Sequence, residues 1–488
     1  MGDRLTCILP YSNKEEMVST LRTFQESGDV ANILVVAKEA IELEGAKVIV
    51  AEGGLDATST WKLLLKEISG NYVAVYGKAM ELRIGLNALE RMRRTCSDAG
   101  AGMVYADYYE KKDGVMTAHP VIEYQEGSLR DDFNFGSLLL FKAEGLKEAV
   151  EAMDADYQFA ALYDLRLRVS QKYDLMHLPE LLYTEVELDT RQSGEKMFDY
   201  VDPRNRDRQI EMELACTAHL KKVGAYLKPV FKTIEFTQGK YPVEASVIIP
   251  VRNREKTISD AIESVLIQET SASFNLIIVD NHSTDKTSEI IRSFDDERLI
   301  HIIPERDDLG IGGCWNVAVA DERCGKFAIQ LDSDDLYIDN HVIERVVKAF
   351  YEQNCAMVVG SYQMVNFKLE EIPPGLIDHK EWTPDNGRNN ALRINGLGAP
   401  RAFYTPVLRD IKVPNTSYGE DYALGLNISR QYQIGRIYDA LYLCRRWDDN
   451  SDASLDITKM NAHNFYKDKI RTLEFKARQQ YVKNGQKV

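Results

Sequence analysis

Apolar residues occur along this chain in short, nearly continuous runs rather than in strict alternation with polar ones. Three runs, at residues 247–249, 276–279 and 327–331, have the length of a strand, and a proline or an aspartate follows each of them. Such runs are typical of parallel strands that helices cover on both faces. Apolar residues at helical spacing occur between them, as in residues 258–266. The pattern predicts an α/β fold with a mostly parallel sheet flanked by helices.

The same pattern occurs twice in the chain. Residues 5–13 match residues 245–253, since each segment is an apolar strand that ends at a proline and is followed by an asparagine. Trp61 then falls where Trp315 falls. The period, roughly 240 to 260 residues, is that of a whole domain rather than of a solenoid repeat. We therefore expect two similar α/β domains in tandem.

Turn-forming residues indicate where the two copies meet. Gly239-Lys240-Tyr241-Pro242 precedes the first strand of the second copy. We predict one domain over residues 1–235, a second over residues 243–455, and a helical tail over residues 456–488. The tail is expected to pack on the rest of the protein, and contact with a partner is the alternative.

Composition narrows the class of protein. The 488 residues are 44% hydrophobic and 28% charged, as in a soluble globular protein, and the net charge of -16 argues against a nucleic-acid partner. No apolar stretch could span a bilayer, the first residues lack the features of a signal peptide, and the seven cysteines show no metal-binding spacing. We expect a cytoplasmic protein with reduced thiols, either in solution or peripherally bound at the inner face of the membrane.

An acidic cluster follows the strand at residues 327–331. It contains Asp332, Asp334 and Asp335, three carboxylates within four residues. Like charges this close repel, and a bound divalent cation removes the repulsion. Carboxylate oxygens suit Mg²⁺ or Mn²⁺, and ligands of open α/β sheets bind just beyond the carboxyl ends of strands. The cluster therefore predicts a metal site, with an acidic turn that caps a helix as the alternative.

Other candidate residues lie in the same copy. Asp280 ends a strand just before a helix N-terminus, which tolerates anions, and Gly310 opens a loop through which a ligand can approach the backbone. Glu420 and Asp421 precede an apolar helix, where a carboxylate is either a general base or a favourable N-terminal charge. Arg446 follows a late strand and is either a phosphate ligand or part of a surface ion pair.

Taken in this order, these motifs resemble the inverting glycosyltransferases of family 2, which have the GT-A fold. Asp332-Ser333-Asp334 is similar to the DxD motif of the family, and Glu420-Asp421 to its ED motif. Residues 279–285 are similar to its nucleotide-binding motif, with Asn281-His282 in place of the usual acidic and glycine residues. The resemblance implies metal-dependent transfer of a sugar, with inversion, from a nucleotide-sugar donor to an acceptor hydroxyl on a glycan or glycoconjugate.

The resemblance also implies roles for individual residues. Asp421 is the base with Glu420 beside it, and Asp334 with Asp332 holds Mn²⁺ or Mg²⁺. The donor-binding residues that it implies are Pro250, Arg252, Asn253, Asp280, Asn281, Gly310, Asn316, Asp332, Ser333 and Arg446. Leu443 stands where processive members carry the glutamine of a QxxRW motif, so we expect a non-processive enzyme.

The first copy lacks the residues of this site. In the register of the repeat, Ala37 stands for Asp280 and Gly77-Lys78-Ala79-Met80 for residues 332–335. The position of Glu420-Asp421 falls near residues 160–162, unless a small gap brings in Asp164. We therefore expect a GT-A-like fold without a donor or metal site, which binds acceptor, braces the second domain or dimerises.

Two other classes of function are possible. A sugar-nucleotidyltransferase usually carries a glycine-rich loop after its first strand, which residues 250–254 lack. A non-catalytic carbohydrate-binding or scaffold protein is the other alternative. The acidic residues that the second copy keeps and the first copy lacks argue against it. The sequence does not identify the nucleotide, the sugar, the acceptor or the oligomeric state.

Overall fold

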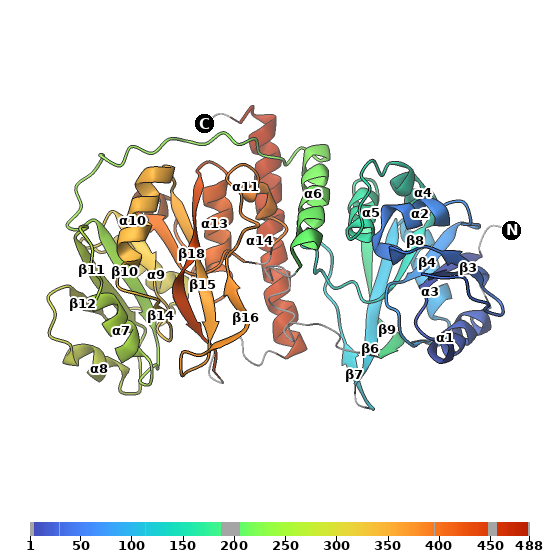
Figure 1. Ribbon diagram of the computed structural model, residues 1–488, viewed down its shortest axis with the longest axis horizontal. Helices are drawn as coiled ribbons and strands as arrows, with labels where there is room; N and C mark the ends of the chain where they lie inside the picture. The colour runs from blue at the N-terminus through green and yellow to red at the C-terminus, as the bar shows by residue number, and fades with distance from the viewer. Residues whose placement is uncertain are drawn as a thin grey trace. The chain divides into compact units, whose positions relative to one another are not determined.

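The computed structural model describes residues 4–28, 30–112, 114–186, 205–394, 396–447 and 456–486. The chain divides into two compact units, which we call unit 1 and unit 2 (Figure 1). Unit 1 comprises residues 1–194, 207–223 and 455–472, and unit 2 comprises residues 195–206, 224–454 and 473–488.

Unit 1 is built on a nine-stranded sheet in the order β3-β2-β1-β4-β8-β6-β9-β5, with β7 paired to β6. Its strands are β1 (Leu5–Pro10), β2 (Val30–Ala37), β3 (Lys47–Val50), β4 (Tyr72–Tyr76), β5 (Leu82–Ile84), β6 (Met103–Lys112), β7 (Val115–His119), β8 (Leu138–Lys142) and β9 (Leu175–Val186). Its helices are α1 (Lys14–Glu26), α2 (Thr58–Leu64), α3 (Ala88–Ala99), α4 (Ala143–Glu151), α5 (Ala161–Ser170) and α6 (Arg206–Lys222). Strands β5, β7 and β8 run against the direction of the other six.

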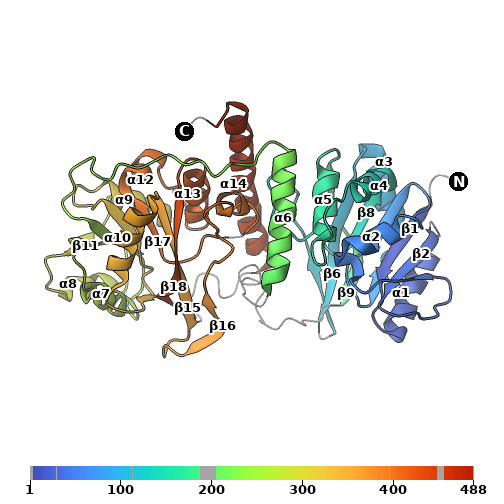
Figure 2. The same ribbon diagram turned by 45° about the horizontal axis from the view of Figure 1, so that its top comes forward.

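Unit 2 repeats this sheet in the order β12-β11-β10-β13-β17-β15-β18-β14, with β16 paired to β15. Figure 2 shows its strands and helices from a second direction. Its strands are β10 (Ala245–Val251), β11 (Phe274–Asp280), β12 (Leu299–Ile302), β13 (Phe327–Gln330), β14 (Leu336–Tyr337), β15 (Met357–Val365), β16 (Glu371–Ile377), β17 (Arg401–Tyr404) and β18 (Ile434–Arg445). Its helices are α7 (Ile258–Leu266), α8 (Thr287–Ser293), α9 (Ile311–Ala320), α10 (Val342–Gln353), α11 (Gly387–Asn390), α12 (Thr405–Ile411) and α13 (Glu420–Ser429). The predicted α/β architecture, with two mostly parallel sheets flanked by helices, is confirmed.

The repeat extends to hydrogen bonds that are partly or fully buried. In unit 1, Thr6 Oγ1 donates to Asn32 Oδ1 at 2.6 Å, and in unit 2, Ser246 Oγ donates to Asn275 Oδ1 at 2.5 Å. Each asparagine amide then donates to a backbone carbonyl, at 3.1 Å in unit 1 and 2.8 Å in unit 2. Buried polar groups need such partners. The two sheets therefore share their internal hydrogen bonding as well as their strand order.

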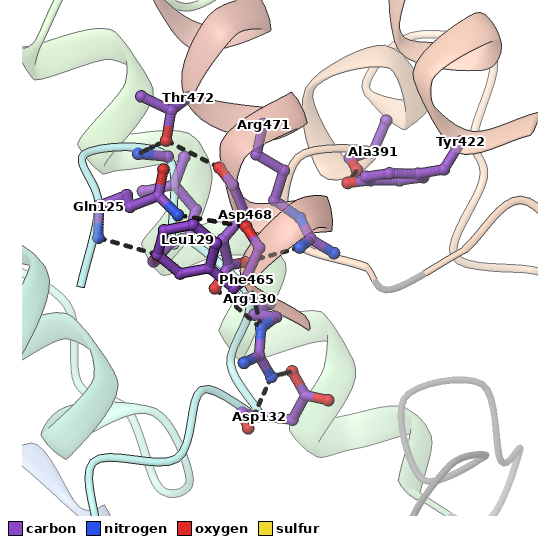
Figure 3. Close-up of polar contacts among 12 residues, drawn as sticks. Gln125, Leu129, Arg130, Asp132, Ala391, Tyr422, Phe465, Asp468, Arg471 and Thr472 are labelled. Carbon is purple, nitrogen blue, oxygen red and sulfur yellow. Dashed lines mark hydrogen bonds and ion pairs between the residues drawn. The ribbon is translucent and has the colours of Figure 1, made fainter. Parts of the chain in front are cut away.

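The C-terminal helix α14 (Ile457–Lys483) has residues up to Thr472 in unit 1 and from Leu473 in unit 2. Within unit 1, the carboxylate of Asp468 pairs with Arg130 at 3.2 Å and with Arg471 at 2.7 Å (Figure 3). Within unit 2, Arg478 pairs with the carboxylate of Glu474 at 2.8 Å. The arginines of this basic helix thus form buried ion pairs. The domain boundaries inferred from the sequence stay a prediction.

Two further features concern the predicted environment of the protein. All seven cysteine thiols are free, and six of them are buried, where they pack as small apolar side chains. Over the described ranges of the chain, no helix is both long and apolar enough to cross a bilayer.

Candidate active site

A cavity of about 300 Å³ opens in unit 2 beyond the carboxyl end of β13. The loop from β13 to β14, the start of β17, the N-terminus of α13 and the end of β18 contribute to its wall. The predicted site residues that line it are Pro250, Asp332, Ser333, Asp334, Glu420, Asp421 and Arg446. The fold therefore brings the acidic cluster and the Glu420-Asp421 pair, which are far apart in the sequence, to one cavity.

The acidic cluster is held by neighbouring strands. Asp332 Oδ1 accepts a hydrogen bond from Gln330 Nε2 at 2.9 Å, and Asp335 Oδ1 accepts one from the backbone N–H of Arg445 at 2.8 Å. Burial raises the pKa of Asp332. Burial also raises the pKa of Asp335 well above its usual range, with help from the charges of Asp334 and Asp332. The cluster is thus an electrostatically unfavourable group in the absence of a cation.

Asp334 lies beside a cationic and an aromatic side chain. Its Oδ2 lies 3.7 Å from Arg254 Nε and accepts a hydrogen bond from Trp447 Nε1 at 3.4 Å. Among the described side chains, no group of three or more His, Cys, Asp or Glu residues is placed to hold a metal ion by itself. Two carboxylates with substrate phosphates are a common set of ligands for Mg²⁺.

The acidic pair opens helix α13. Asp421 Oδ2 forms an ion pair with Arg401 Nη1 at 2.5 Å, and Asp421 Oδ1 accepts the backbone N–H of Tyr422 at 2.7 Å. The Tyr422 hydroxyl donates to the Ala391 carbonyl at 2.5 Å, which anchors this first turn (Figure 3). Burial, together with the charge of Asp421, raises the pKa of Glu420 to about 8. The two neighbours therefore differ in their surroundings, because Asp421 has a cationic partner, whereas burial and the charge of Asp421 favour the protonated form of Glu420.

Arg401 is a residue that sequence reasoning missed. It is the first residue of β17, its side chain is 15% exposed, and its Nη1 also donates to the Leu397 carbonyl at 2.8 Å. Its backbone N–H donates at 3.1 Å to Oε1 of Gln330, the same side chain that donates to Asp332. Arg401 belongs to no motif. The only feature of the sequence that could have identified it is its position as a charged residue at the start of a short apolar strand.

Six predicted donor-binding residues do not line the cavity: Arg252, Asn253, Asp280, Asn281, Gly310 and Asn316. Asp280 is fully buried and accepts hydrogen bonds from the backbone N–H of Ser283 at 3.0 Å and from the Ser288 hydroxyl. Burial alone would raise its pKa, but hydrogen bonds from His301, Ser283 and Ser288 bring the pKa well below its usual range. The carboxylate thus closes the turn after β11, and its role in donor binding stays a prediction.

The loop after β10 uses a different arginine from the one predicted. Asn253 has a φ of 54° and its Oδ1 accepts the backbone N–H of Thr284 at 2.8 Å, which ties this loop to the turn after β11. Arg252 is exposed, whereas Arg254 lines the cavity. Arg254 is therefore a second cavity residue that the motif did not indicate.

The remaining predicted donor residues hold the loop around α9. Asn281 Nδ2 donates to a carbonyl of this loop at 2.7 Å, and the Asn316 side chain exchanges two hydrogen bonds with the backbone of Val413, at 2.7 and 2.9 Å. A Cβ at Gly310 would come within 2.6 Å of the backbone of Thr416. Close packing within the protein thus accounts for this glycine.

Comparison with known proteins places the chain in a family. The model of "Glycosyl transferase family 2" matches residues 246–406. The UDP-Glc:alpha-D-GlcNAc-diphosphoundecaprenol beta-1,3-glucosyltransferase WfgD of Escherichia coli is 34% identical over 205 residues, which are 41% of this chain and 76% of the relative. The chain belongs to glycosyltransferase family 2.

Other relatives cover less of their own length or resemble the chain more weakly. An uncharacterised glycosyltransferase of Rickettsia felis is 26% identical over 57% of this chain, and the match spans half of that relative. Among solved structures, Staphylococcus aureus TarS 1–349 in complex with UDP-GlcNAc has 23% identity and a TM-score of 0.37, covering 48% of this chain and 72% of that chain.

Strand pairing identifies which residues of unit 1 stand at the site positions of this family 2 protein. Because β2 pairs with β1 in the register in which β11 pairs with β10, Ala37 stands for Asp280, as the sequence repeat indicated. The pairing of β8 with β4 matches that of β17 with β13, and it sets Leu139 at the position of Arg401. Both positions lose their charge in unit 1.

The acidic pair is also absent from unit 1. Helices α5 and α13 have ten residues each and precede the equivalent strands β9 and β18 by the same interval, so no gap separates the two copies here. Ala161 and Leu162 therefore stand for Glu420 and Asp421. Asp164 is not brought to this position and instead pairs with Arg168 at 2.7 Å.

The loop that follows β4 differs from its counterpart in length. Ile84 of β5 and Tyr337 of β14 occupy equivalent places beside β9 and β18. The segment from Tyr76 to Ile84 is two residues longer than the segment from Leu331 to Tyr337. The register of the sequence repeat therefore cannot hold through the whole loop.

The longer loop changes which residues of unit 1 correspond to the acidic cluster. The sequence register, which set residues 79–80 against residues 334–335, holds at Gly77 but is wrong at the far end of the loop. There Glu81 takes the place of the second aspartate of the DxD-like motif. Its carboxylate is paired with Arg83 at 2.8 Å, and this hydrogen bond lowers its pKa.

An ion pair fills the equivalent of the cavity wall in unit 1. Lys78 Nζ lies 2.6 Å from Glu185, whose side chain is fully buried. The pairing of β9 with β6 sets Glu185 at the position of Cys444, which lines the cavity of unit 2. At this place unit 1 thus has a paired lysine and glutamate, whereas unit 2 has an acidic cluster.

The raised pKa of Glu420 predicts a pH-dependent cost to folding. Because the folded protein holds this proton more tightly than the unfolded chain does, the protonated group stabilises the fold at low pH. That contribution is lost as the pH rises from about 4.3, the value of a free glutamate, to about 8. In metal-free buffer, Glu420→Gln should gain in melting temperature relative to the wild type across this window and keep a constant difference outside it. A difference that does not change with pH would contradict the assignment.

Proposed function

We propose that unit 2 transfers a sugar from a nucleotide-sugar donor to a hydroxyl group of an acceptor, with inversion and without processivity. The observation that carries the proposal is the single cavity between the acidic cluster at Asp332 and Asp334 and the acidic pair at Glu420 and Asp421. Family membership supports the reaction class, and the missing glutamine at Leu443 supports single transfers.

The donor end of the cavity offers groups for a diphosphate. Arg254 and Arg446 both line it, and Nε of Arg254 has no hydrogen-bond partner among the residues described. Guanidinium groups suit phosphate oxygens because they donate several hydrogen bonds and remain charged. In a chain with a net charge of -16, such local cations are needed to attract an anionic donor.

The cluster also fits a divalent cation. We assign Asp334 and Asp332 to hold Mn²⁺ or Mg²⁺, because both are partly exposed to the cavity, whereas Asp335 is buried. The raised pKa values of Asp332 and Asp335 support this fit, since both carboxylates lie where a negative charge is unfavourable without a cation. When bound, the cation supplies positive charge beside the leaving diphosphate.

The acceptor end of the cavity requires a base. The acceptor oxygen bonds to the anomeric carbon from the face opposite the diphosphate, which leaves with the electron pair of its bond, and this geometry inverts the anomer. Asp421 takes the proton of the acceptor hydroxyl. Glu420 is less suited, because its raised pKa, about 8, leaves it protonated at neutral pH.

The name of one relative indicates which substrates to test first. The Escherichia coli relative is named for UDP-Glc and an acceptor that carries GlcNAc, so uridine diphosphate sugars are the first donors to test. The free thiols support a reducing compartment such as the cytoplasm. The direct experiment is a screen of UDP-, GDP- and dTDP-sugars for donor hydrolysis in the presence of Mn²⁺. No hydrolysis or transfer with any of them would contradict the proposal.

Loss of Asp334 should abolish activity while the fold survives. Asp334→Ala removes a carboxylate from the cavity wall, so melting temperature should change little and donor turnover should fall below detection. Excess EDTA should have the same effect on the wild type. Asp339→Ala, a nearby carboxylate in a surface ion pair with Arg345, is the matched control and should retain full activity. Full turnover in EDTA would contradict the metal assignment.

Loss of the base should separate binding from transfer. Asp421→Asn keeps the shape of the side chain and removes its basicity, so transfer should fall by roughly 10² to 10⁴ while donor binding, measured by calorimetry, persists. Glu420→Gln should be the milder change. The reverse order, with Glu420→Gln damaging and Asp421→Asn mild, would mean that the two roles are exchanged.

A further inference from the structure

Arg401 connects the two ends of the cavity. Its guanidinium pairs with Asp421 Oδ2 at 2.5 Å, and its backbone N–H donates to Gln330 Oε1 at 3.1 Å. The amide nitrogen of Gln330 donates to Asp332 Oδ1 at 2.9 Å. Through the side chain and backbone of Arg401 and the amide of Gln330, polar contacts thus link the Asp421 carboxylate at the start of α13 to the first carboxylate of the acidic cluster.

Arg401 is the cation that three acids of the cavity share. The charges of Asp421, Asp332 and Glu420 raise its pKa, in that order of strength, against the opposing effect of burial. A buried cation is costly unless it is paired and hydrogen-bonded. Its presence in the wall of the cavity therefore reflects the acids around it rather than a requirement of the sheet.

Unit 1 provides an internal control for that statement. It has the same sheet with Leu139 at the position of Arg401, and Leu139 is buried in the core. Gly77, Ala161 and Leu162 stand for Asp332, Glu420 and Asp421 in the same unit. The arginine is thus lost together with the acids that face it, while the structural asparagine of the sheet interior is kept in both units.

We propose that Arg401 is a positioning residue for sugar transfer, which fixes the carboxylate of Asp421 against the acceptor and couples it to the acidic cluster that binds the donor. The proposal rests on the transferase function proposed above. The ion pair with Arg401 and the hydrogen bond from the backbone N–H of Tyr422 hold the Asp421 carboxylate in one orientation, so its remaining lone pairs keep a constant direction. A base displaced by about 1 Å can lose on the order of 10²-fold in rate.

The test compares Arg401→Leu, the residue that unit 1 carries, with Arg401→Lys and Arg401→Leu/Asp421→Leu. We expect Arg401→Leu to lower kcat by about 10- to 100-fold with little change in KM for the donor. Arg401→Lys should restore part of the rate. The double variant should be no slower than Asp421→Leu alone, since residues that act as a unit are not additive.

The control is Arg409→Leu, on helix α12 just after β17. Arg409 is also partly buried and donates to the Val319 carbonyl at 2.8 Å, so its loss should lower melting temperature without lowering kcat. Wild-type kcat in Arg401→Leu, or additive losses in the double variant, would overturn the proposal. If Arg401→Leu does not fold, the kcat of Arg401→Lys and that of the double variant test the proposal in its place. A wild type that turns over no donor would instead overturn the transferase function, and this inference with it.

Discussion

The repulsion among buried carboxylates around one cavity is the constraint on which the functional half of this protein depends. Asp332 and Asp335 follow β13, which pairs on both sides, and a hydrogen bond holds each carboxylate in place, from the Gln330 amide and from the backbone N–H of Arg445. Their raised pKa values express that confinement. The cavity also contains cations: Arg254, Arg401 and Arg446 belong to the chain, and a divalent ion is proposed in addition. The negative phosphates of a bound donor would share this cation with the carboxylates.

The two units separate what the fold requires from what the site requires. Both keep the strand order and the buried asparagine bonds, so these features serve the sheet. Only unit 2 has Arg401 and Asp421, where unit 1 has Leu139 and Leu162. Apolar residues pack at these positions without the desolvation cost of ions. The charged set is thus the kind of locally unfavourable choice that proteins keep where function needs it.

Much of this architecture could be predicted from the sequence, because buried parallel strands are continuous apolar runs and the repeat shows their order. The DxD-like and Glu420-Asp421 segments could be located because each combines carboxylates with a strand end or a helix start. Arg401 could not, since its role arises from the antiparallel pairing of β17 with β13, which local sequence does not encode. The loop after β4 was misaligned because two extra residues leave no local signal. Asp280 was assigned to the donor from its motif, but its hydrogen bonds within the turn are visible only in three dimensions.

The central claim is that one unit of two equivalent folds holds the donor site. Hydrogen–deuterium exchange with and without UDP and Mn²⁺ tests it most directly, because occupancy is read separately in each unit. The account predicts protection at residues 331–337 and 420–429 of unit 2, and unchanged exchange at residues 76–84 and 161–170 of unit 1. Metal-dependent protection at the unit 1 segments, or none in unit 2 with any nucleoside diphosphate, would contradict it.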